Sequence, residues 1–366
     1  MSAARPAHPM GDEPHARSLA SSLVDRLTDP VLRDLAWLLD SADLLRAQPA
    51  MPLARPWSDD AEAAQVAAWL VQLDHDPSRL QRLHAALESA RVTRLGRYAE
   101  TLLGWYLENG PALRLVAANI ALRGEGRTIG ECDFLLETPD GTRVHWELAV
   151  KCFLHAGAAH ESASRLADYV GPNLRDRLDL KFAHLRDHQL RLSERPELAS
   201  LGFAGQWCAQ MYIKGWLFYR AGTQVADAPE LAREHGRGWW VTHADWSAFA
   251  ERSDADGWSV LPRLAWLAPR RIESRPAASF ATNSQFSAAQ QSDGDAVPES
   301  MSAHLARMEI QAPADAATLF ANLERAHEPV MVVAFTADGA GGYVEHSRGF
   351  IVPDDWPERA LAYARS

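Results

Sequence analysis

Two carboxylates and one ammonium whose spacing could support chemistry lie in residues 130–154, GECDFLLETPDGTRVHWELAVKCFL. Pro139-Asp140-Gly141 predicts a tight turn between two β-strands, and successive side chains of a strand point to opposite faces. Glu147 and Lys151 therefore share one face of the second strand, and Asp133 on the first strand could lie across from Glu147. Charged groups with apolar flanks are costly unless they are paired or hold a metal. That cost makes this hairpin the main clue to function.

These three groups fit the hydrolysis of a phosphodiester. The reaction needs an activated water, neutralisation of the negative charge on the phosphoryl group, and a stabilised leaving oxygen. One or two Mg²⁺ ions held by carboxylates can supply all three. Asp133 and Glu147 would hold Mg²⁺ or Mn²⁺, and Lys151 would position the attacking water or stabilise the developing charge. The residues alone leave an alternative open, in which the acids and the lysine form only a structural ion pair that holds the hairpin together.

Two flanking segments must position the hairpin. Residues 94–109 predict a helix that ends at Asn109-Gly110-Pro111, and its Glu100 either points at the sheet or is a solvated surface residue. Residues 176–193 predict a second helix, with Gln189 on its core-facing stripe. A polar amide in such a stripe must find partners or face a cavity. Both helices can therefore bring a polar group to the two acids.

This order of elements resembles the PD-(D/E)XK nuclease superfamily: a helix with Glu100, a strand with Asp133, a turn, a strand with Glu147 and a lysine, and a helix with Gln189. A closer resemblance, over roughly residues 90–355, is to an uncharacterised bacterial family, domain of unknown function 1853; it rests on segments such as GECDFLL, HWELAVKCFL, DRLDLKFAHLRDHQL and RGFIVPDDWP.

The resemblance implies roles for individual residues. Asp133 and Glu147 would be metal ligands, Glu100 an auxiliary ligand, and Gln189 an amide that orients the substrate or lies behind the ligands. The superfamily pattern places its lysine two residues after the second acid, where this chain has Ala149. Lys151 keeps the same face but is displaced by about 7 Å along the strand. The resemblance therefore implies either a metal-dependent nuclease or a catalytically inactive nuclease fold used for binding or assembly.

We expect an α/β fold: a mixed central sheet flanked by helices, restriction-endonuclease-like by resemblance, with an N-terminal helical cap and a C-terminal β-hairpin. The predicted organisation, in chain order, is a disordered N-terminus (1–17), the helical cap (18–92), the nuclease-like core (93–272), a linker or mobile loop (273–312), and a C-terminal helix and hairpin that pack on the core (313–366). Within the cap, residues 59–73 and 77–90 read as two amphipathic helices.

Composition limits the possible partners and compartment. The 366 residues carry a net charge of −11, which disfavours tight nonspecific binding of DNA or RNA unless a bound divalent cation or a local basic groove compensates. Three cysteines without a CxxC pair fit a reducing cytoplasm. No run approaches the ~18 apolar residues of a membrane helix. We therefore expect a cytoplasmic protein whose partner is DNA or RNA and whose cofactor is Mg²⁺ or Mn²⁺.

Overall fold

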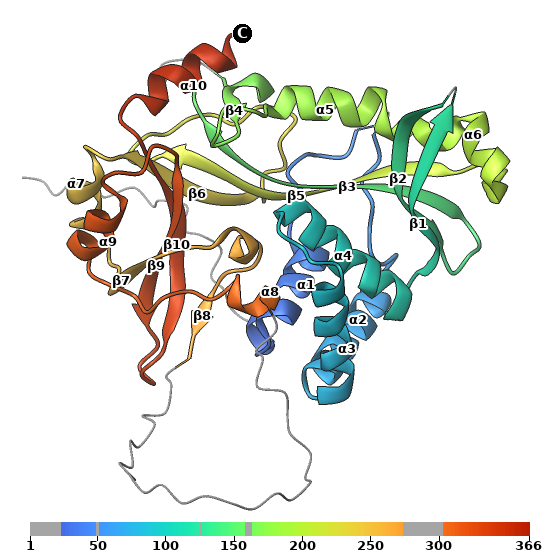
Figure 1. The fold of residues 1–366 in the computed structure, drawn as a ribbon, viewed down its shortest axis with the longest axis horizontal. Helices are drawn as coiled ribbons and strands as arrows, with labels where there is room; N and C mark the ends of the chain where they lie inside the picture. The colour runs from blue at the N-terminus through green and yellow to red at the C-terminus, as the bar shows by residue number, and fades with distance from the viewer. Residues whose placement is uncertain (1–22, 49–50, 125, 158–162, 274–302) are drawn as a thin grey trace, which may run out of the picture.

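The computed structural model describes residues 23–48, 51–124, 126–157, 163–273 and 303–366. The predicted disordered N-terminus and most of the predicted linker lie outside this part. The described residues contain one mixed sheet with helices on both of its faces (Figure 1). Along the sheet the strands are β1 (Arg114–Gly124), β2 (Arg127–Glu137), β3 (Arg143–His155), β5 (Cys208–Arg220), β6 (Gly236–Thr242), β10 (Tyr343–Val352), β9 (Val330–Ala337) and β7 (Gly257–Val260).

Both strand directions occur in this sheet. The β1–β2–β3 end and the β10–β9–β7 end are antiparallel, whereas β3–β5, β5–β6 and β6–β10 are parallel pairs. Two short strands pair off this path, β4 (Tyr169–Val170) with β3 and β8 (Arg271–Ile272) with β10. The predicted mixed α/β architecture is confirmed.

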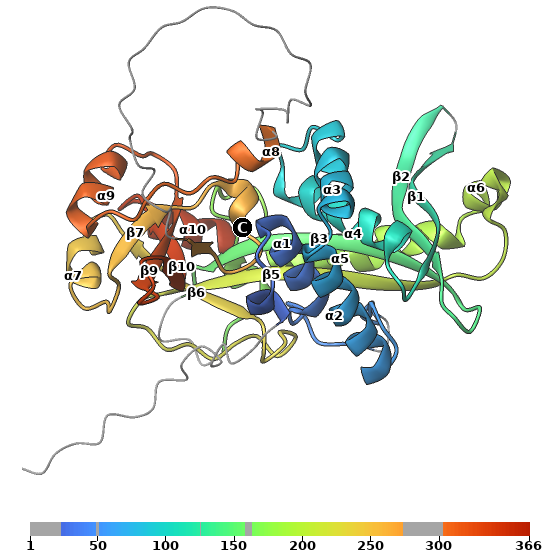
Figure 2. The same cartoon turned by 90° about the horizontal axis from the view of Figure 1, so that it is seen from below.

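Helices cover the sheet from two sides. In Figure 1, α5 and α10 lie above the sheet and the four N-terminal helices lie below it. Figure 2 shows these four helices from below, lying across the long strands β3 and β5. The long helices are α1 (Pro30–Asp40), α2 (Asp60–Asp74), α3 (Pro77–Ser89), α4 (Leu95–Asn109), α5 (Leu178–Asp187) and α10 (Trp356–Ala364); short ones are α6 (Pro196–Leu198), α7 (Trp246–Ala250), α8 (Ala303–Ala306) and α9 (Ala316–Leu323).

Side-chain caps fix where the N-terminal helices begin. The Asp29 carboxylate accepts hydrogen bonds from the backbone N–H of Val31 (2.9 Å) and Leu32 (3.0 Å), and Pro30 occupies the first helical position. Asp59 and Asp76 cap α2 and α3 in the same way. The helices predicted for residues 59–73, 77–90 and 94–109 are confirmed.

A buried ionic network joins the N-terminal helices to the rest of the fold. Asp34 of α1 is fully buried and accepts hydrogen bonds from Arg270 Nη2 (2.8 and 3.0 Å) and from the Tyr98 hydroxyl of α4 (2.9 Å). The backbone N–H of Arg270 in turn donates to Glu345 Oε2 (2.7 Å) on β10, and Glu345 pairs with Arg348. Because a buried charge is costly without its partner, this network ties α1 and α4 to β10.

The C-terminal hairpin is part of the main sheet. β9 and β10 pair antiparallel, and β10 adds to β6 in parallel register from Gly349↔Trp239 to Val352↔Thr242. The sequence predicted that this hairpin packs on the core. The structure shows the closer relation, in which its backbone hydrogen bonds continue the sheet.

The predicted helix over residues 176–193 is shorter than expected. α5 ends at Asp187, and His188 leaves the helical region with φ −124° and ψ −65°. Gln189 then begins a 3₁₀ segment, η3 (Gln189–Glu194). Leu190 is buried in the cluster of α5 and Leu192 in a different cluster with Cys132. Leucines buried in two different clusters cannot both lie on the single apolar face of one continuous helix. The break after α5 therefore turns the Gln189 side chain toward Glu147.

Candidate metal centre

Asp133 and Glu147 meet where β2 and β3 separate. The ladder between these strands runs from Glu137↔Arg143 to Phe134↔Trp146. Just beyond its Phe134 end, Glu147 Oε1 accepts from the backbone N–H of Asp133 (3.4 Å), and Asp133 Oδ2 accepts from the backbone N–H of Leu148 (2.8 Å). Each carboxylate thus bonds to the backbone of the other strand. The structure brings the two acids together, as the hairpin geometry predicts.

The Glu147 side chain is fully buried and bonded through both oxygens. Oε1 also lies 2.8 Å from His145 Nε2, and Oε2 accepts from the Gln189 amide at 2.6 Å. Gln189 Oε1 in turn accepts from Lys181 Nζ at 3.0 Å. These contacts form a chain from Lys181 on α5, through Gln189 on η3, to Glu147 on β3. The break after α5 therefore supplies an amide that links a lysine to the second acid.

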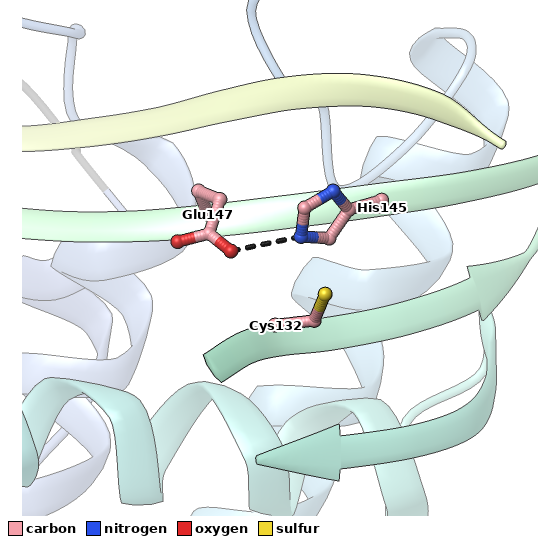
Figure 3. A group of neighbouring side chains, drawn as sticks. All are labelled: Cys132, His145 and Glu147. Atoms are coloured by element: carbon pink, nitrogen blue, oxygen red, sulfur yellow. Dashed lines mark hydrogen bonds and ion pairs between the residues drawn. The ribbon is translucent and has the colours of Figure 1, made fainter. Parts of the chain in front are cut away.

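His145 and Cys132 complete the deep side of this centre. His145 is fully buried, and its Nδ1 lies 3.1 Å from Ser193 Oγ. The potential ligand atoms of Cys132, His145 and Glu147 all lie within 4.8 Å of one another. Figure 3 shows the Cys132 thiol on β2 pointing toward the His145–Glu147 pair on β3. Soft and hard donor atoms thus share one small buried volume.

Glu100 lies on α4, and its charge acts on Asp133 without a hydrogen bond between them. Its carboxylate accepts from Arg97 Nη1 at 2.5 Å. Its negative charge also contributes to raising the pKa of Asp133, after the larger effects of burial and Glu147. Arg97 additionally reaches Asn119 Oδ1 on β1 (3.4 Å). The structure therefore brings Asp133, Glu147 and Gln189 into hydrogen-bonded contact where β2 and β3 separate, whereas the ion pair of Glu100 is with Arg97.

Lys151 lies on the same strand as Glu147 but makes its ion pair elsewhere. Its ammonium pairs with Asp176, just before α5, and each of these side chains is 34% exposed. The ammonium that hydrogen-bonds into the network of the acids belongs to Lys181. Burial lowers the pKa of Lys181, the charge of Lys151 lowers it further, and Asp176, Asp133 and Glu147 oppose both effects. The charges of both acids therefore act on Lys181, and its hydrogen-bonded connection to Glu147 passes through Gln189.

Burial controls the protonation of the centre. It raises the pKa of Asp133 to about 8, with the charge of Glu147 as the second cause. It also raises the pKa of Glu147 to about 8, although the hydrogen bond from Asp133 N–H and the charge of Lys181 oppose the rise. Burial lowers the pKa of His145 to about 4. Two carboxylates removed from water and close together favour a bound proton or a cation.

We expect the metal-free protein to lose stability as the pH rises from about 6.5 to about 8, above the range in which the lowered pKa of His145 opposes the effect of the two acids. A carboxyl group whose pKa is raised on folding binds more protons in the folded state than in the unfolded chain, where its pKa is about 4. Its contribution is complete below the unfolded value and is lost as the pH rises through the folded value. Melting temperatures measured in a chelator at successive pH values should therefore fall, and Mn²⁺ should reverse the fall at pH 8.

Asp133→Asn is the matched variant for this profile. The amide oxygen of asparagine can still accept from Leu148 N–H, while the repulsion between the two carboxylates is removed. Its metal-free melting temperature at pH 8 should rise by roughly 1–2 °C for each kcal/mol of repulsion removed, because the unfolding entropy that divides the free-energy change grows with the 366-residue length of the chain. If the acids only hold the hairpin together, the same change should instead lower the melting temperature.

Sequence reasoning missed Cys132, His145, Ser193 and Lys181 as members of the centre. A signal for His145 was present, because strand alternation places it on the Glu147 face. Cys132 gave none, since it adjoins Asp133 in sequence and simple alternation sends the two side chains to opposite faces. Asn119 on β1 lies between the residues paired with Phe134 and Cys132, and so opposite Asp133. Its left-handed backbone (φ 53°) is a local irregularity of the strand pair at that point. Lys181 required the docking of α5, which no local pattern reveals.

None of the helices in the described part of the chain has the length and apolar character of a membrane span.

Comparisons with known proteins identify a family. No curated protein matches the chain, and no solved structure matches it. The model of the family described as Domain of unknown function (DUF1853) matches residues 33–352. Since that match covers most of the 366 residues, the chain belongs to the DUF1853 family.

Proposed function

We propose that this protein is a Mg²⁺- or Mn²⁺-dependent phosphodiesterase that cleaves nucleic acid, built on a PD-(D/E)XK-type, restriction-endonuclease-like core. One observation carries the proposal: Asp133 and Glu147 lie together at the point where β2 and β3 separate, and a lysine reaches them through Gln189. Paired carboxylates on rigid strands suit a hard divalent cation, which prefers oxygen ligands. The raised pKa of both acids supports the same reading, because burial removes the carboxylates from water and a bound cation would offset that cost.

Each side chain of the centre has its own role in the proposed reaction. Asp133 and Glu147 would hold the cation, which would supply the activated water and neutralise charge on the phosphoryl group. Gln189 holds Glu147 Oε2 in place with a 2.6 Å hydrogen bond. Lys181, 3.0 Å from the Gln189 oxygen, would orient the attacking water or stabilise the developing charge. Glu100 adds negative charge beside Asp133 and would serve as an auxiliary ligand.

Lys151 has only an indirect role in the proposed reaction. It was expected to supply the ammonium of the superfamily pattern, and in the structure it pairs with Asp176. Its charge lowers the pKa of Lys181, so it acts on the centre through that residue. We assign the ammonium role to Lys181, because its hydrogen bond connects it to the acids.

A nucleic-acid substrate is consistent with the charges around the centre. Arg97, whose side chain is 52% exposed, pairs with Glu100. Arg191, on the same 3₁₀ segment as Gln189, is 64% exposed and pairs with Glu194. Arginines at such positions can bind the phosphates on either side of a cleaved bond. With a net charge of −11, binding should depend on the divalent cation and should weaken with salt.

The direct test is cleavage by the purified full chain. Single- and double-stranded DNA and RNA should be nicked or degraded with Mg²⁺ or Mn²⁺ and left intact in EDTA, and Asp133→Ala should abolish cleavage. Glu137→Gln is the matched control, because Glu137 lies on the same strand and only pairs with exposed Arg114. The absence of cleavage of every nucleic acid with both metals would refute the proposed activity.

A second function is supported by a specific observation. Glu147 is fully buried, and both of its oxygens already accept hydrogen bonds from the protein. This state suits a catalytically silent nuclease fold that serves binding or assembly. Such a module need not bind Mn²⁺, so calorimetric Mn²⁺ binding that Glu147→Gln removes separates the two functions.

A further inference from the structure

A group of three different donor side chains lies beside the proposed magnesium ligands. Cys132, His145 and Glu147 offer a sulfur, a nitrogen and an oxygen, all within 4.8 Å of one another, and all three residues are fully buried. Mg²⁺ is held by oxygen ligands, and a thiol and an imidazole add nothing to such a site. The same two groups together with one carboxylate are typical zinc ligands.

We propose that Cys132, His145 and Glu147 form a second, soft-metal site that takes Zn²⁺ and shares Glu147 with the Asp133–Glu147 pair. Zinc sites with three protein ligands keep a fourth position open for water. Zn–N and Zn–S bonds of about 2.0–2.1 and 2.3 Å place the nitrogen and sulfur of a tetrahedral site about 3.5 Å apart. To hold the ion, the thiol would move closer to the other two ligands, and the 2.8 Å contact between His145 Nε2 and Glu147 Oε1 would open to about 3.4 Å.

The surroundings of His145 provide the support that a zinc ligand needs. A ligating imidazole usually donates its second N–H to an outer partner, which fixes the tautomer. Ser193 Oγ lies 3.1 Å from His145 Nδ1 and can accept that hydrogen bond. With the proton on Nδ1, Nε2 is free to bind the metal that replaces its contact with Glu147. Cys132 would release its thiol proton to solvent and bind as the thiolate.

The remaining oxygen of Glu147 is also supported. Gln189 donates to Oε2 at 2.6 Å, so Oε1 can turn to the metal while the carboxylate stays in place. Asp133 and Gln189 both contact Glu147 and are themselves half-buried, so solvent comes within one residue of the group.

Sharing Glu147 has a consequence that rests on the proposed function. When Glu147 Oε1 binds Zn²⁺ beside Cys132 and His145, that oxygen is no longer available to a cation held with Asp133, so Zn²⁺ and the catalytic cation compete for Glu147. Zinc is then an inhibitor of the enzyme, and this inhibition should disappear when the Cys132 ligand is removed.

Cobalt titration of the full-length, metal-free protein tests the site. One equivalent of Co²⁺, a spectroscopic substitute for Zn²⁺, should give the near-ultraviolet band of a cobalt–thiolate bond, and Zn²⁺ should displace it. Cys132→Ser should lose the band. Cys152→Ser is the matched control, because Cys152 is also buried but lies outside the group, and it should keep the band. No band in the wild type, or a band that survives Cys132→Ser, would overturn the proposal.

Two measurements on the wild-type chain avoid any folding defect of the variant. X-ray absorption of the protein with one equivalent of Zn²⁺ should show one sulfur neighbour at about 2.3 Å; a shell of nitrogen and oxygen alone would reject the site. Electron paramagnetic resonance should show bound Mn²⁺ released by that equivalent of Zn²⁺. Mn²⁺ that binds and is not displaced contradicts the shared site but leaves the nuclease proposal standing. Zinc bound through sulfur, without any Mn²⁺ binding, would support the zinc site and contradict the nuclease proposal.

Discussion

Lys181→Met should lower Mn²⁺-dependent cleavage by about 10²–10³-fold, the usual cost of removing one donor that stabilises transition-state charge. Lys151→Met should cost far less. The difference follows from their partners, since Lys181 donates to Gln189 at 3.0 Å and Gln189 bonds to Glu147, whereas Lys151 pairs with Asp176. The measurement is kcat under saturating Mn²⁺ on a defined oligonucleotide.

The two lysines make a well-matched comparison. Both are partly buried, and each interacts with the charge of Asp176. Lys181→Arg adds a second control, because arginine keeps the charge but changes the geometry of its donors. Mn²⁺ binding by both methionine variants should persist, which separates a loss of catalysis from a loss of the metal. A larger loss for Lys151→Met than for Lys181→Met would return the ammonium role to Lys151.

Glu147→Gln should abolish Mn²⁺-dependent cleavage while leaving the fold intact. The substitution keeps the size of the side chain and one oxygen that can accept from His145 and from Asp133 N–H, but it removes the charge that a divalent cation requires. The new NH₂ group replaces the oxygen that accepts from Gln189, so the Gln189 amide must flip to present its own oxygen. An acid that directly holds the catalytic metal leaves little activity when it becomes an amide, so a loss of at least about 10³-fold is expected. Glu137→Gln, on the neighbouring strand, should retain activity, and thermal melting should show both variants folded.

Some parts of the fold could be predicted from the sequence because they depend on contacts between residues close together in the chain. The Pro139-Asp140-Gly141 turn and the alternation along β3 placed Asp133 and Glu147 across from one another, and the hydrogen bonds between each acid and the opposite backbone agree with that expectation. Aspartates before the first turns of α1 and α3 marked where those helices begin. In each case the deciding contacts join residues close in sequence or across one short turn.

Other parts depend on contacts between distant segments. Lys151 and Asp176 are 25 residues apart, and their pairing depends on how the chain returns to β3 before α5. The parallel pairing of β10 with β6 joins segments about a hundred residues apart, from Trp239 to Gly349. The break at His188, which turns Gln189 toward Glu147, follows from burial of η3 on two sides. Periodicity alone predicted one continuous helix there.

Isothermal titration of the metal-free protein with Mn²⁺ tests the central claim most directly. The proposed centre predicts saturable Mn²⁺ binding to the wild-type chain, loss of that binding in Glu147→Gln, and retention in Glu137→Gln. Wild-type protein that binds no Mn²⁺, or a Glu147→Gln variant that binds it as the wild type does, would contradict a metal centre at Asp133 and Glu147.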